Sequence, residues 1–489
     1  MFSFSRTRMR APERRNFKIN AFGGYVTGVA ENLIDLSESK YCFNFVARDG
    51  ELTQGSGTIP AKIKIGGEER ALPQPKENLT GVWFYKRYDK ELGSNDRLVV
   101  QGVSGKLYYL VLLDGEKFEE ISVETGEVYT AVCYRYGEDD VLLIGASEGL
   151  FYLSGEELVK VESAPSVKDL CIHSERAFAC VSGEGVKLWF SDTLDPTDWT
   201  IGVDSGGYIE FANYGGALKK LVSFGGYLYV FREYGIERVT AYGDQSEFAV
   251  KNVYASTERI YENTVAVCGS RIVFLSERGL HVFDGAVVSN MNKVVLSEEY
   301  GDRGSYARAN YYKGVYRLAL FMKSMESDEG GVKQNFVKNN VLLSYDTTSG
   351  RIDLTSDHDI SSFCTVTVGD SSGLIALLEP SLQRPTTRLI SFCEECRRLG
   401  YPAYMYWRTG MTDLGYPERS KFLKSLTVTM QEYGTVGVIL DDEIVKFEWI
   451  KGVQKKLNVN KRFKKLGVFF QTYGTKQRIG NPVITVDMR

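Results

Sequence analysis

The stretch FSDTLDPTDWT holds three aspartates at every third position, next to a proline and a tryptophan. A calcium loop of the EF-hand type needs ligands at alternate positions, a central glycine and a glutamate at the twelfth position, and this stretch has a different spacing and no glycine. Aspartates in a proline-containing segment commonly accept hydrogen bonds from their own backbone. We therefore predict a structural turn without a metal, formed by Asp192, Asp195, Pro196, Asp198 and Trp199.

The sequence CEEC gives Cys393 and Cys396 the spacing of half a zinc site. A structural zinc ion takes four ligands, and the chain offers neither a second CxxC nor a paired His-x3-His. A redox role would need a thioredoxin-like βαβ pattern around the two cysteines, which is not present. On a helix the two sulfurs would share one face, so a buried structural pair is the favoured interpretation, and no metal or cofactor is predicted.

Motifs for nucleophilic catalysis and nucleotide binding are missing from the sequence. It contains no G-x-S-x-G, no P-loop and no G-x-G-x-x-G that opens a helix. Carboxylates cluster at Glu138–Asp140 and Asp441–Glu443, both in polar contexts typical of turns between strands. A glycosidase pair stays open as an alternative, but we predict no catalytic residue and no enzymatic activity.

The elements expected to carry these residues are β-hairpins. Runs such as SGKLYYLVLLDGEKFEEI, DDVLLIGASEGLFYLSGEELVKV and FGGYLYVFREYGIERV each show two apolar, strand-like segments around a glycine turn. The composition, with 12% aromatic residues, 49 glycines and 11 prolines, also favours strands joined by tight turns. Repeated antiparallel units of this size predict a β-propeller, because a single blade cannot bury both of its faces. A pair of β-sandwiches is the alternative.

The pattern changes after Pro385. The run TTRLISFCEECRRLG has apolar residues at helical spacing before Gly400 and is compatible with a short helix. Long strands resume beyond it. The predicted fold class is all-β, a β-propeller with a C-terminal β-sandwich. The predicted domains are a basic N-terminal arm (1–20), the β-propeller (21–385), a linker with the short helix (386–403) and the β-sandwich (404–489).

Positive charge is concentrated at the two ends of a chain whose net charge is −4. Residues 1–18 carry six basic side chains and one acidic one, and residues 451–478 carry nine basic side chains and no acidic one. Such segments can dock on an acidic neighbour or on phosphate, although basic residues also protect sheet edges from pairing. The predicted partner-interaction residues are Arg6, Arg8, Arg10, Arg14, Arg15, Lys455, Lys456, Lys461, Arg462, Lys464 and Lys465.

Apolar runs and cysteines bear on the location of the protein. No window approaches 18 consecutive apolar residues, so no membrane-spanning helix is expected. The first 15 residues lack the apolar core of a signal sequence. Eight cysteines scattered over 489 residues indicate reduced thiols in a cytoplasm rather than a disulfide-rich secreted scaffold.

Several segments together resemble the tail-associated β-propeller proteins of tailed bacteriophages. Near the N-terminus the likeness lies in Asn44, Arg48, Asp49, Gly50, Leu52 and Gly57. FSDTLDPTDWT is similar to an S-x-x-x-D-P-T-x-W segment of that family, and YVFREYGIERV and IVFLSERGLHVFDG resemble two of its blade hairpins. MTDLGYPERSKFLKSLTV is similar to the segment that leads into its C-terminal sandwich.

The resemblance implies a virion component of the tail or of the portal-proximal connector, of the tail-hub or packaged-DNA-stabilisation type. Such proteins assemble in the host cytoplasm as homo-oligomeric rings that stabilise the DNA exit channel, and they have no enzymatic activity. The implied partners are further copies of the chain, portal, adaptor or other tail subunits, and packaged double-stranded DNA bound without sequence specificity. Two alternatives remain: a glycan-binding propeller for host recognition, and a glycoside hydrolase of propeller fold.

Overall fold

The computed structural model describes residues 12–89, 93–121, 123–203, 205–292, 294–323, 338–356, 358–381 and 384–488. The described residues form an all-β protein with one four-residue α-helix, α1 (Ser297–Tyr300). Short 3-10 turns are η1 (Glu31–Leu33), η2 (Asn213–Gly215), η3 (Gln245–Glu247) and η4 (Gly301–Tyr306). Within this part of the chain, no helix is long and apolar enough to cross a membrane.

The chain divides into two compact units. The propeller unit comprises Ile59–Thr348 and Asp357–Phe392, and the second unit comprises Met1–Thr58, Ser349–Ser356 and Cys393–Arg489. The second unit therefore combines the N-terminal segment with the C-terminal strands. The predicted boundaries differ from this division, because they placed residues 21–58 in the propeller.

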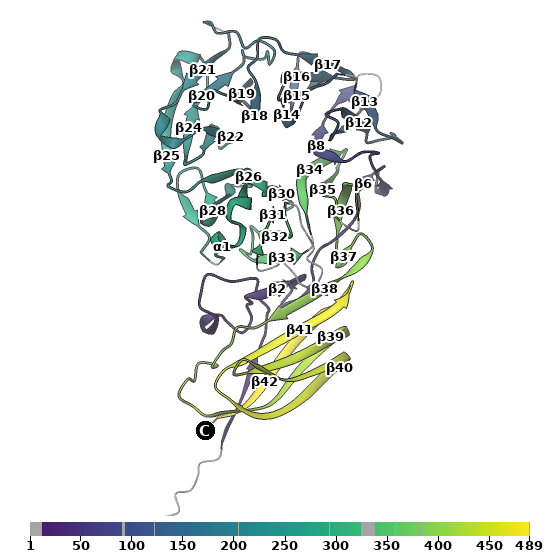
Figure 1. The fold of residues 1–489 in the computed structure, drawn as a ribbon, viewed down its shortest axis with the longest axis vertical. Coiled ribbons are helices and arrows are strands. Elements are labelled where there is room, and N and C mark those ends of the chain that lie inside the picture. The colour runs from purple at the N-terminus through teal and green to yellow at the C-terminus, as the bar shows by residue number, and fades with distance from the viewer. Residues whose placement is uncertain are drawn as a thin grey trace, which may run out of the picture. The chain divides into compact units, whose positions relative to one another are not determined.

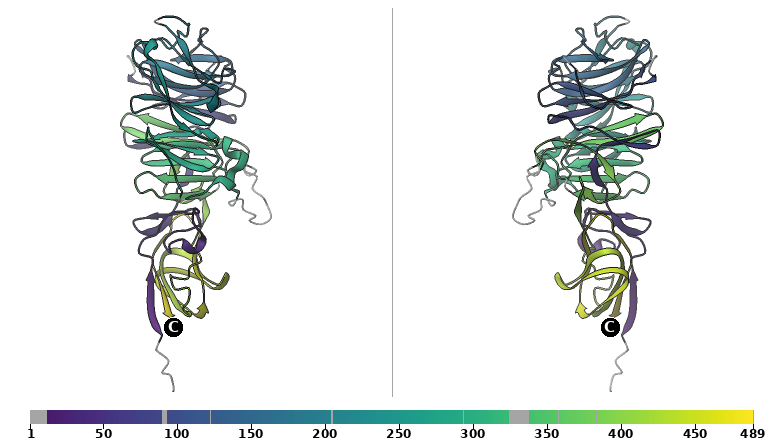
Figure 2. Two further views of the ribbon diagram at one scale, coloured as in Figure 1. Left: turned by 90° about the vertical axis from the view of Figure 1, so that its left-hand side faces the viewer. Right: turned by 90° about the vertical axis from the view of Figure 1, so that its right-hand side faces the viewer.

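Six four-stranded antiparallel sheets form the blades of the propeller (Figures 1 and 2). The first three are β8 (Leu79–Tyr85), β11 (Arg97–Gly102), β12 (Leu107–Val111) and β13 (Glu119–Ile121); β14 (Val128–Tyr136), β15 (Asp139–Ala146), β16 (Gly149–Ser154) and β17 (Glu157–Lys160); and β18 (Val167–His173), β19 (Arg176–Val181), β20 (Lys187–Phe190) and β21 (Gly207–Glu210). The other three are β22 (Leu218–Phe224), β23 (Tyr227–Arg232), β24 (Gly235–Thr240) and β25 (Ala249–Ala255); β26 (Ile260–Cys268), β27 (Arg271–Ser276), β28 (Gly279–Phe283) and β29 (Val288–Asn290); and β30 (Arg308–Tyr312), β31 (Val315–Leu320), β32 (Val341–Asp346) and β33 (Ile352–Ser356). The residues of β33 are counted with the second unit in the division given above, although the strand completes the sixth sheet.

The ring of blades is closed by β34 (Ile360–Val368), β35 (Ser371–Leu378) and β36 (Arg388–Cys393). β34 packs beside β30 on one side and beside β8 on the other. Smaller strands of this unit are β6 (Lys62–Ile65) with β7 (Glu68–Ala71), and β9 (Tyr88–Asp89) with β10 (Gly93–Ser94). The predicted β-propeller is thus confirmed.

The propeller core lies between neighbouring blades. One buried cluster joins Val99 of the first blade to Leu142 of the second, and another joins Phe178 of the third blade to Val230 of the fourth. Each central strand is covered on both faces, so it is apolar on both. β19, with the sequence RAFACV, is buried at every position. This explains why several hairpins read as continuous apolar runs rather than as alternating ones.

The predicted helix within residues 386–403 is wrong. This segment forms β36, then a turn, then β37 (Arg397–Arg398) and the start of β38 (Tyr401–Arg408). β36 pairs antiparallel with β35 in the register Ile375↔Ser391 to Leu378↔Arg388. The available edge of β35 outweighed an apolar spacing that fits a helix only over one short segment, since tertiary context overrides local preference.

The second unit is built around the C-terminal strands. Its sheet runs in the order β3, β4, β42, β39, β41, β38 and β37, with β1 paired to β42, β2 to β38 and β40 to β39. These strands are β1 (Glu13–Lys18), β2 (Tyr41–Phe43), β3 (Phe45–Arg48), β4 (Glu51–Gln54), β39 (Lys421–Leu440), β40 (Glu443–Phe463), β41 (Leu466–Gly474) and β42 (Arg478–Met488). β5 (Gly57–Pro60) follows β4 in the chain.

β39 changes partner along its length. Residues 421–430 pair with β42, and residues 435–440 pair with β41. The change coincides with a register irregularity between Met430 and Gly434. The core of the unit includes Trp407, whose ring centroid lies 5.0 Å from that of Phe22 and 5.7 Å from that of Phe470.

Asp353 is a buried carboxylate in the second unit. Arg351 Nε donates a hydrogen bond to its Oδ2 at 3.0 Å. Burial nevertheless raises the pKa of Asp353 to about 6, against the opposing effect of Arg351. Below about pH 4 the group is protonated in both the folded and the unfolded chain. As the pH rises from about 4 to about 6, only the unfolded chain releases the proton, so folding stability is lost over this window.

We expect Asp353→Asn to remove this loss. Relative to the parent chain, the variant should gain about 1–3 kcal/mol of unfolding free energy between pH 4 and pH 7, because each pKa unit corresponds to about 1.4 kcal/mol. Urea unfolding at a series of pH values measures the difference. Asp442→Asn, in an exposed turn residue, is the matched control and should follow the parent curve. A constant offset between Asp353→Asn and the parent across the range would contradict the prediction.

Candidate functional site

The three aspartates of FSDTLDPTDWT lie in the segment that follows β20. Asp192 Oδ1 accepts from the backbone N–H of Thr193 at 2.6 Å, and Asp198 Oδ1 accepts from that of Thr200 at 2.9 Å. Asp195 Oδ1 accepts from both the backbone N–H (2.9 Å) and the hydroxyl (2.6 Å) of Thr197. Each carboxylate thus bonds its own backbone one or two residues onward, which is the behaviour of turn aspartates.

Trp199 anchors this turn. Its side chain is 1% exposed and packs in the cluster between the second and third blades. Its indole Nε1 donates to the carbonyl oxygen of Pro196 at 2.8 Å. Asp192 also lies 3.6 Å from Arg176 Nη1. No group of three or more His, Cys, Asp or Glu side chains that could hold a metal occurs in the described part of the chain.

Cys393 and Cys396 do not share a helix face. Cys393 is the last residue of β36, and Cys396 lies in the turn before β37. The Cys393 thiol donates a hydrogen bond to the carbonyl oxygen of Glu395, with the sulfur 3.3 Å from the oxygen. Cys396 is fully buried. All eight cysteines are free thiols.

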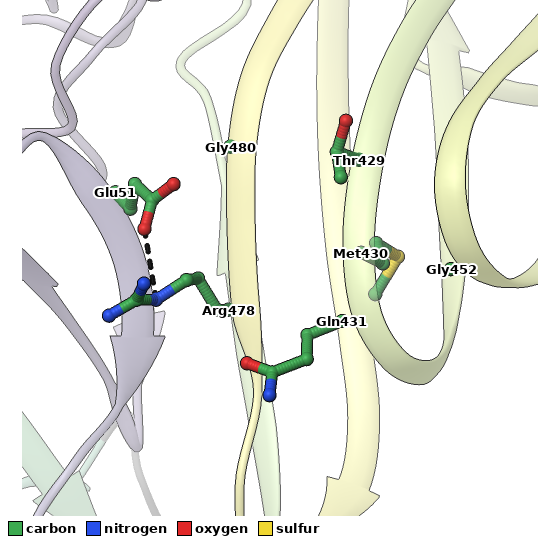
Figure 3. Close-up of a pocket in the computed structure, with 7 residues that line it drawn as sticks. All are labelled: Glu51, Thr429, Met430, Gln431, Gly452, Arg478 and Gly480. Atoms are coloured by element: carbon green, nitrogen blue, oxygen red, sulfur yellow. Dashed lines mark ion pairs between the residues drawn. The ribbon is translucent and has the colours of Figure 1, made fainter.

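A hollow of about 380 Å³ opens on the second unit (Figure 3). Its charged groups are Glu51 and Arg478, joined by an ion pair of 3.0 Å. The rest of the lining comes from β39, β40 and β42: Thr429, Met430, Gln431, Gly452 and Gly480. With its one carboxylate paired to a guanidinium, this lining has no pair of carboxylates for general acid and base catalysis.

A second hollow, of about 550 Å³, lies on the first and second blades. Glu116, Glu119 and Glu156 line it beside Tyr109. Burial and the hydrogen bond with Glu156 raise the pKa of Tyr109 to about 12, and the Arg97 guanidinium lies 4.4 Å from the centre of its ring. The three glutamates are exposed, and one lysine of the lining, Lys117, lies 4.0 Å from Glu119. Acidic side chains therefore outnumber basic ones in this hollow.

The predicted N-terminal arginines fall into two groups, those outside the described residues and those that bind other side chains of the same chain. Arg6, Arg8 and Arg10 lie outside the described residues. Residues 13–18 form β1, which pairs antiparallel with β42. In β1, Arg14 Nε forms a 2.8 Å ion pair with Asp487. The Arg15 guanidinium donates hydrogen bonds to the Glu13 carboxylate and to the Tyr416 hydroxyl oxygen. Arg14 and Arg15 are therefore engaged within the chain.

The C-terminal basic residues are all exposed. Lys455, Lys456, Lys461 and Arg462 lie on β40, and Lys464 and Lys465 follow it. Over the described part of the chain, none of these six side chains has a carboxylate within ion-pair distance. β40 pairs with β39 alone among the described strands, so its other edge faces outward. The structure thus brings the six C-terminal candidates together on one outward-facing hairpin, apart from Arg14 and Arg15.

Sequence reasoning missed a cluster of aromatic side chains on the second unit. This aromatic face comprises Tyr41, Phe43, Tyr404, Tyr406, Tyr433, Phe447, Trp449, Phe469 and Tyr473. A signal was present in the alternate aromatic positions of YPAYMYWR and KFEWI. It could not be used without the strand register, which decides the residues that lie opposite one another.

Fold and sites define an all-β propeller protein with an outward-facing basic hairpin. No family model matches the chain, and no curated protein matches it. Among solved structures it is similar to the N-terminal domain of Nup159, with a TM-score of 0.40 and 9% identity over 76% of this chain and 99% of that chain. A likeness at this level says nothing about function.

Proposed function

We propose that the protein is a non-enzymatic structural component of a bacteriophage virion, in the tail or the portal-proximal connector. It assembles as a homo-oligomeric ring that stabilises the DNA exit channel. Its partners are further copies of itself and portal, adaptor or other tail subunits, and packaged DNA is a candidate for contact without sequence specificity. The proposal includes a β-sandwich for residues 404–489, because β39 changes partner at its irregularity as strands that switch between packed sheets do.

The observation that supports the proposal best is the basic segment formed by the end of β40 and the two lysines that follow it. Six exposed lysine and arginine side chains have no intramolecular carboxylate partner in the described chain. A charged surface of this kind, repeated in every subunit of a ring, multiplies weak contacts with acidic neighbours. The Asp192–Trp199 segment agrees with the proposal as a structural turn, since its carboxylates are used in backbone hydrogen bonds.

We expect the purified chain to form closed rings with an open centre. Negative-stain electron microscopy and mass photometry measure this and give the copy number. Rings held partly by exposed charges should dissociate between 0.1 and 1 M salt, because the Debye length falls from about 10 to about 3 Å over this range. A chain that stays monomeric at every concentration and salt level would exclude a ring-forming component.

A further inference from the structure

The aromatic face lies on one side of five neighbouring strands of the second unit. Residues directly opposite one another in adjacent strands point to the same side of a sheet. One row runs through Phe43, Tyr406, Gln471, Thr435 and Trp449. Figure 1 shows β38, β41, β39 and β40 in this part of the chain.

A second row crosses the same strands through Tyr41, Arg408, Phe469, Gly437 and Phe447. The Phe469 ring lies over Gly437, where an added Cβ would meet a ring atom at 1.9 Å. The glycine therefore lets this ring lie flat on the sheet, in line with Phe447.

The opposite side of these strands is core. Trp407, Phe470, Val436 and Val438 alternate with the aromatic-face residues along β38, β41 and β39, and all four are fully buried. The sheet thus has one buried apolar side and one aromatic side. On the aromatic side Phe469 is buried in a small cluster with Met411 and Ile439, whereas Tyr433, Trp449 and Phe447 are exposed. An alternating strand would ordinarily carry polar residues on that second side.

The exposed aromatic area is large. Tyr41, Tyr433, Trp449, Tyr473 and Phe447 are between 39 and 68% exposed. At about 200 Å² for each side chain, these five rings alone expose roughly 500–600 Å². A standard protein interface takes about 800 Å² from each partner, and monomeric proteins rarely expose an apolar patch of this size without a function.

The polar groups of the face are engaged with one another. The Tyr404 hydroxyl donates to Gln471 Oε1 at 3.0 Å. Arg408 forms a 2.6 Å ion pair with Glu31, and its guanidinium lies 4.0 Å from the centre of the Tyr41 ring. A glycan would need convergent groups for its hydroxyls. A face of Tyr, Trp, Phe and Arg instead has the composition of the centre of a protein interface.

The distribution of charged residues indicates which protein surface could bind the aromatic face. Beyond Trp449, β40 continues to Lys456 and Arg462, which are exposed and alternate with the buried Leu457 and Phe463. Residues 114–162 of the same chain contain thirteen acidic and three basic residues, and they include the hollow lined by Glu116, Glu119 and Glu156. One chain thus carries two different surfaces of opposite charge, which is what a head-to-tail contact between copies requires.

We propose that the aromatic face and the following basic part of β40 dock on the acidic surface of the first and second blades of a second copy of this chain. Phe447 and Trp449 lie at the centre of this contact. Lys456 and Arg462, which point away from the buried Leu457 and Phe463 of the same strand, face the glutamates of the neighbour together with the exposed Lys464. A head-to-tail contact repeats from copy to copy and closes a ring when its rotation allows. The inference rests on the proposed ring, and the experiment separates the two.

The experiment compares the assembly of variants by mass photometry and negative-stain electron microscopy. Phe447→Ser with Trp449→Ser should raise the concentration needed for half-assembly at least tenfold, without changing thermal unfolding, because both side chains are mostly exposed. Tyr242→Ser with Val203→Ser, which removes two exposed apolar side chains of the propeller, is the matched control and should assemble as the parent does.

A charge exchange identifies the partner surface. Lys456, Arg462 and Lys464 all changed to Glu should weaken assembly, and so should Glu116, Glu119 and Glu156 all changed to Lys. The chain that carries all six changes should regain rings. Rings that withstand the Phe447 and Trp449 changes, or no recovery in the six-fold variant, would overturn this contact while leaving the ring in place. Glycan binding by the parent chain, lost in the Phe447 and Trp449 variant, would also overturn it. A monomeric parent chain would overturn the proposed function as well.

Discussion

Arg232→Met should lower the unfolding free energy of the propeller by about 3–5 kcal/mol, because it leaves the buried carboxylate of Glu237 without its counter-charge. The two side chains are 1 and 4% exposed and form a 3.1 Å ion pair. Arg232 also donates to the carbonyl oxygens of Ala212 and Gly216, at 2.7 Å from Nη2 in both cases. One guanidinium therefore ties β23 to the segment that precedes the fourth blade. Thermal and urea unfolding measure the loss.

The double variant Arg232→Met with Glu237→Leu should be less destabilised than Arg232→Met alone, because it removes the unpaired carboxylate. The matched control is the exposed pair of Lys106 and Glu120 in the first blade, 2.6 Å apart. Lys106→Met should cost far less than Arg232→Met, as exposed ion pairs contribute little. Equal costs for Arg232→Met and Lys106→Met would show that burial does not set the strength of these pairs.

Asn44→Ala should destabilise the second unit by about 2–4 kcal/mol. Asn44 is fully buried, and its Nδ2 donates to Ser356 Oγ at 2.8 Å and to the carbonyl oxygen of Tyr404 at 2.7 Å. Its Oδ1 accepts from the Ser356 N–H at 2.9 Å and from Arg398 Nη2 at 2.6 Å. Each lost bond costs about 1 kcal/mol, and the partners left buried without one add to the loss.

Backbone strain at Asn44 can be measured separately, because the residue has a φ of 61°. Asn44→Gly loses the same four hydrogen bonds but adopts this conformation without strain, so it should be up to about 1 kcal/mol less destabilised than Asn44→Ala. Hydrogen exchange monitored by mass spectrometry should show faster exchange in residues 401–408 in both variants, with the propeller peptides as an internal control. Unchanged exchange there would mean that these bonds contribute no net stability.

The hairpins of the propeller were predictable because their information is local. A glycine turn between two apolar segments specifies an antiparallel pair regardless of the rest of the chain. DDVLLIGASEGLFYL became β15 and β16 in the register Leu142↔Leu153 to Ala146↔Gly149. The blade faces were equally readable, since strands covered on both sides must be apolar on both.

The segment around Cys393 and Cys396 is where the prediction from local sequence pattern was wrong, because a short helix was predicted there. Its apolar spacing fits one short helix, but its first residues complete a sheet with β35. The pairing of β1 with β42 was equally hidden, because the partners are more than 460 residues apart in the chain. The strand propensity of either segment does not indicate which distant segment it pairs with.

By itself the sequence determined the all-β class, the repeated hairpins and the concentration of positive charge near the C-terminus, because composition, turn residues and charge are properties of the chain as written. Only the tertiary structure decided that Phe43, Tyr406 and Trp449 lie in one row, that Asn44 holds Ser356 and Arg398, and that Asp353 is buried. These features depend on the register between strands that are distant in sequence. A shift of one residue in any of those strands would turn the aromatic face toward the core.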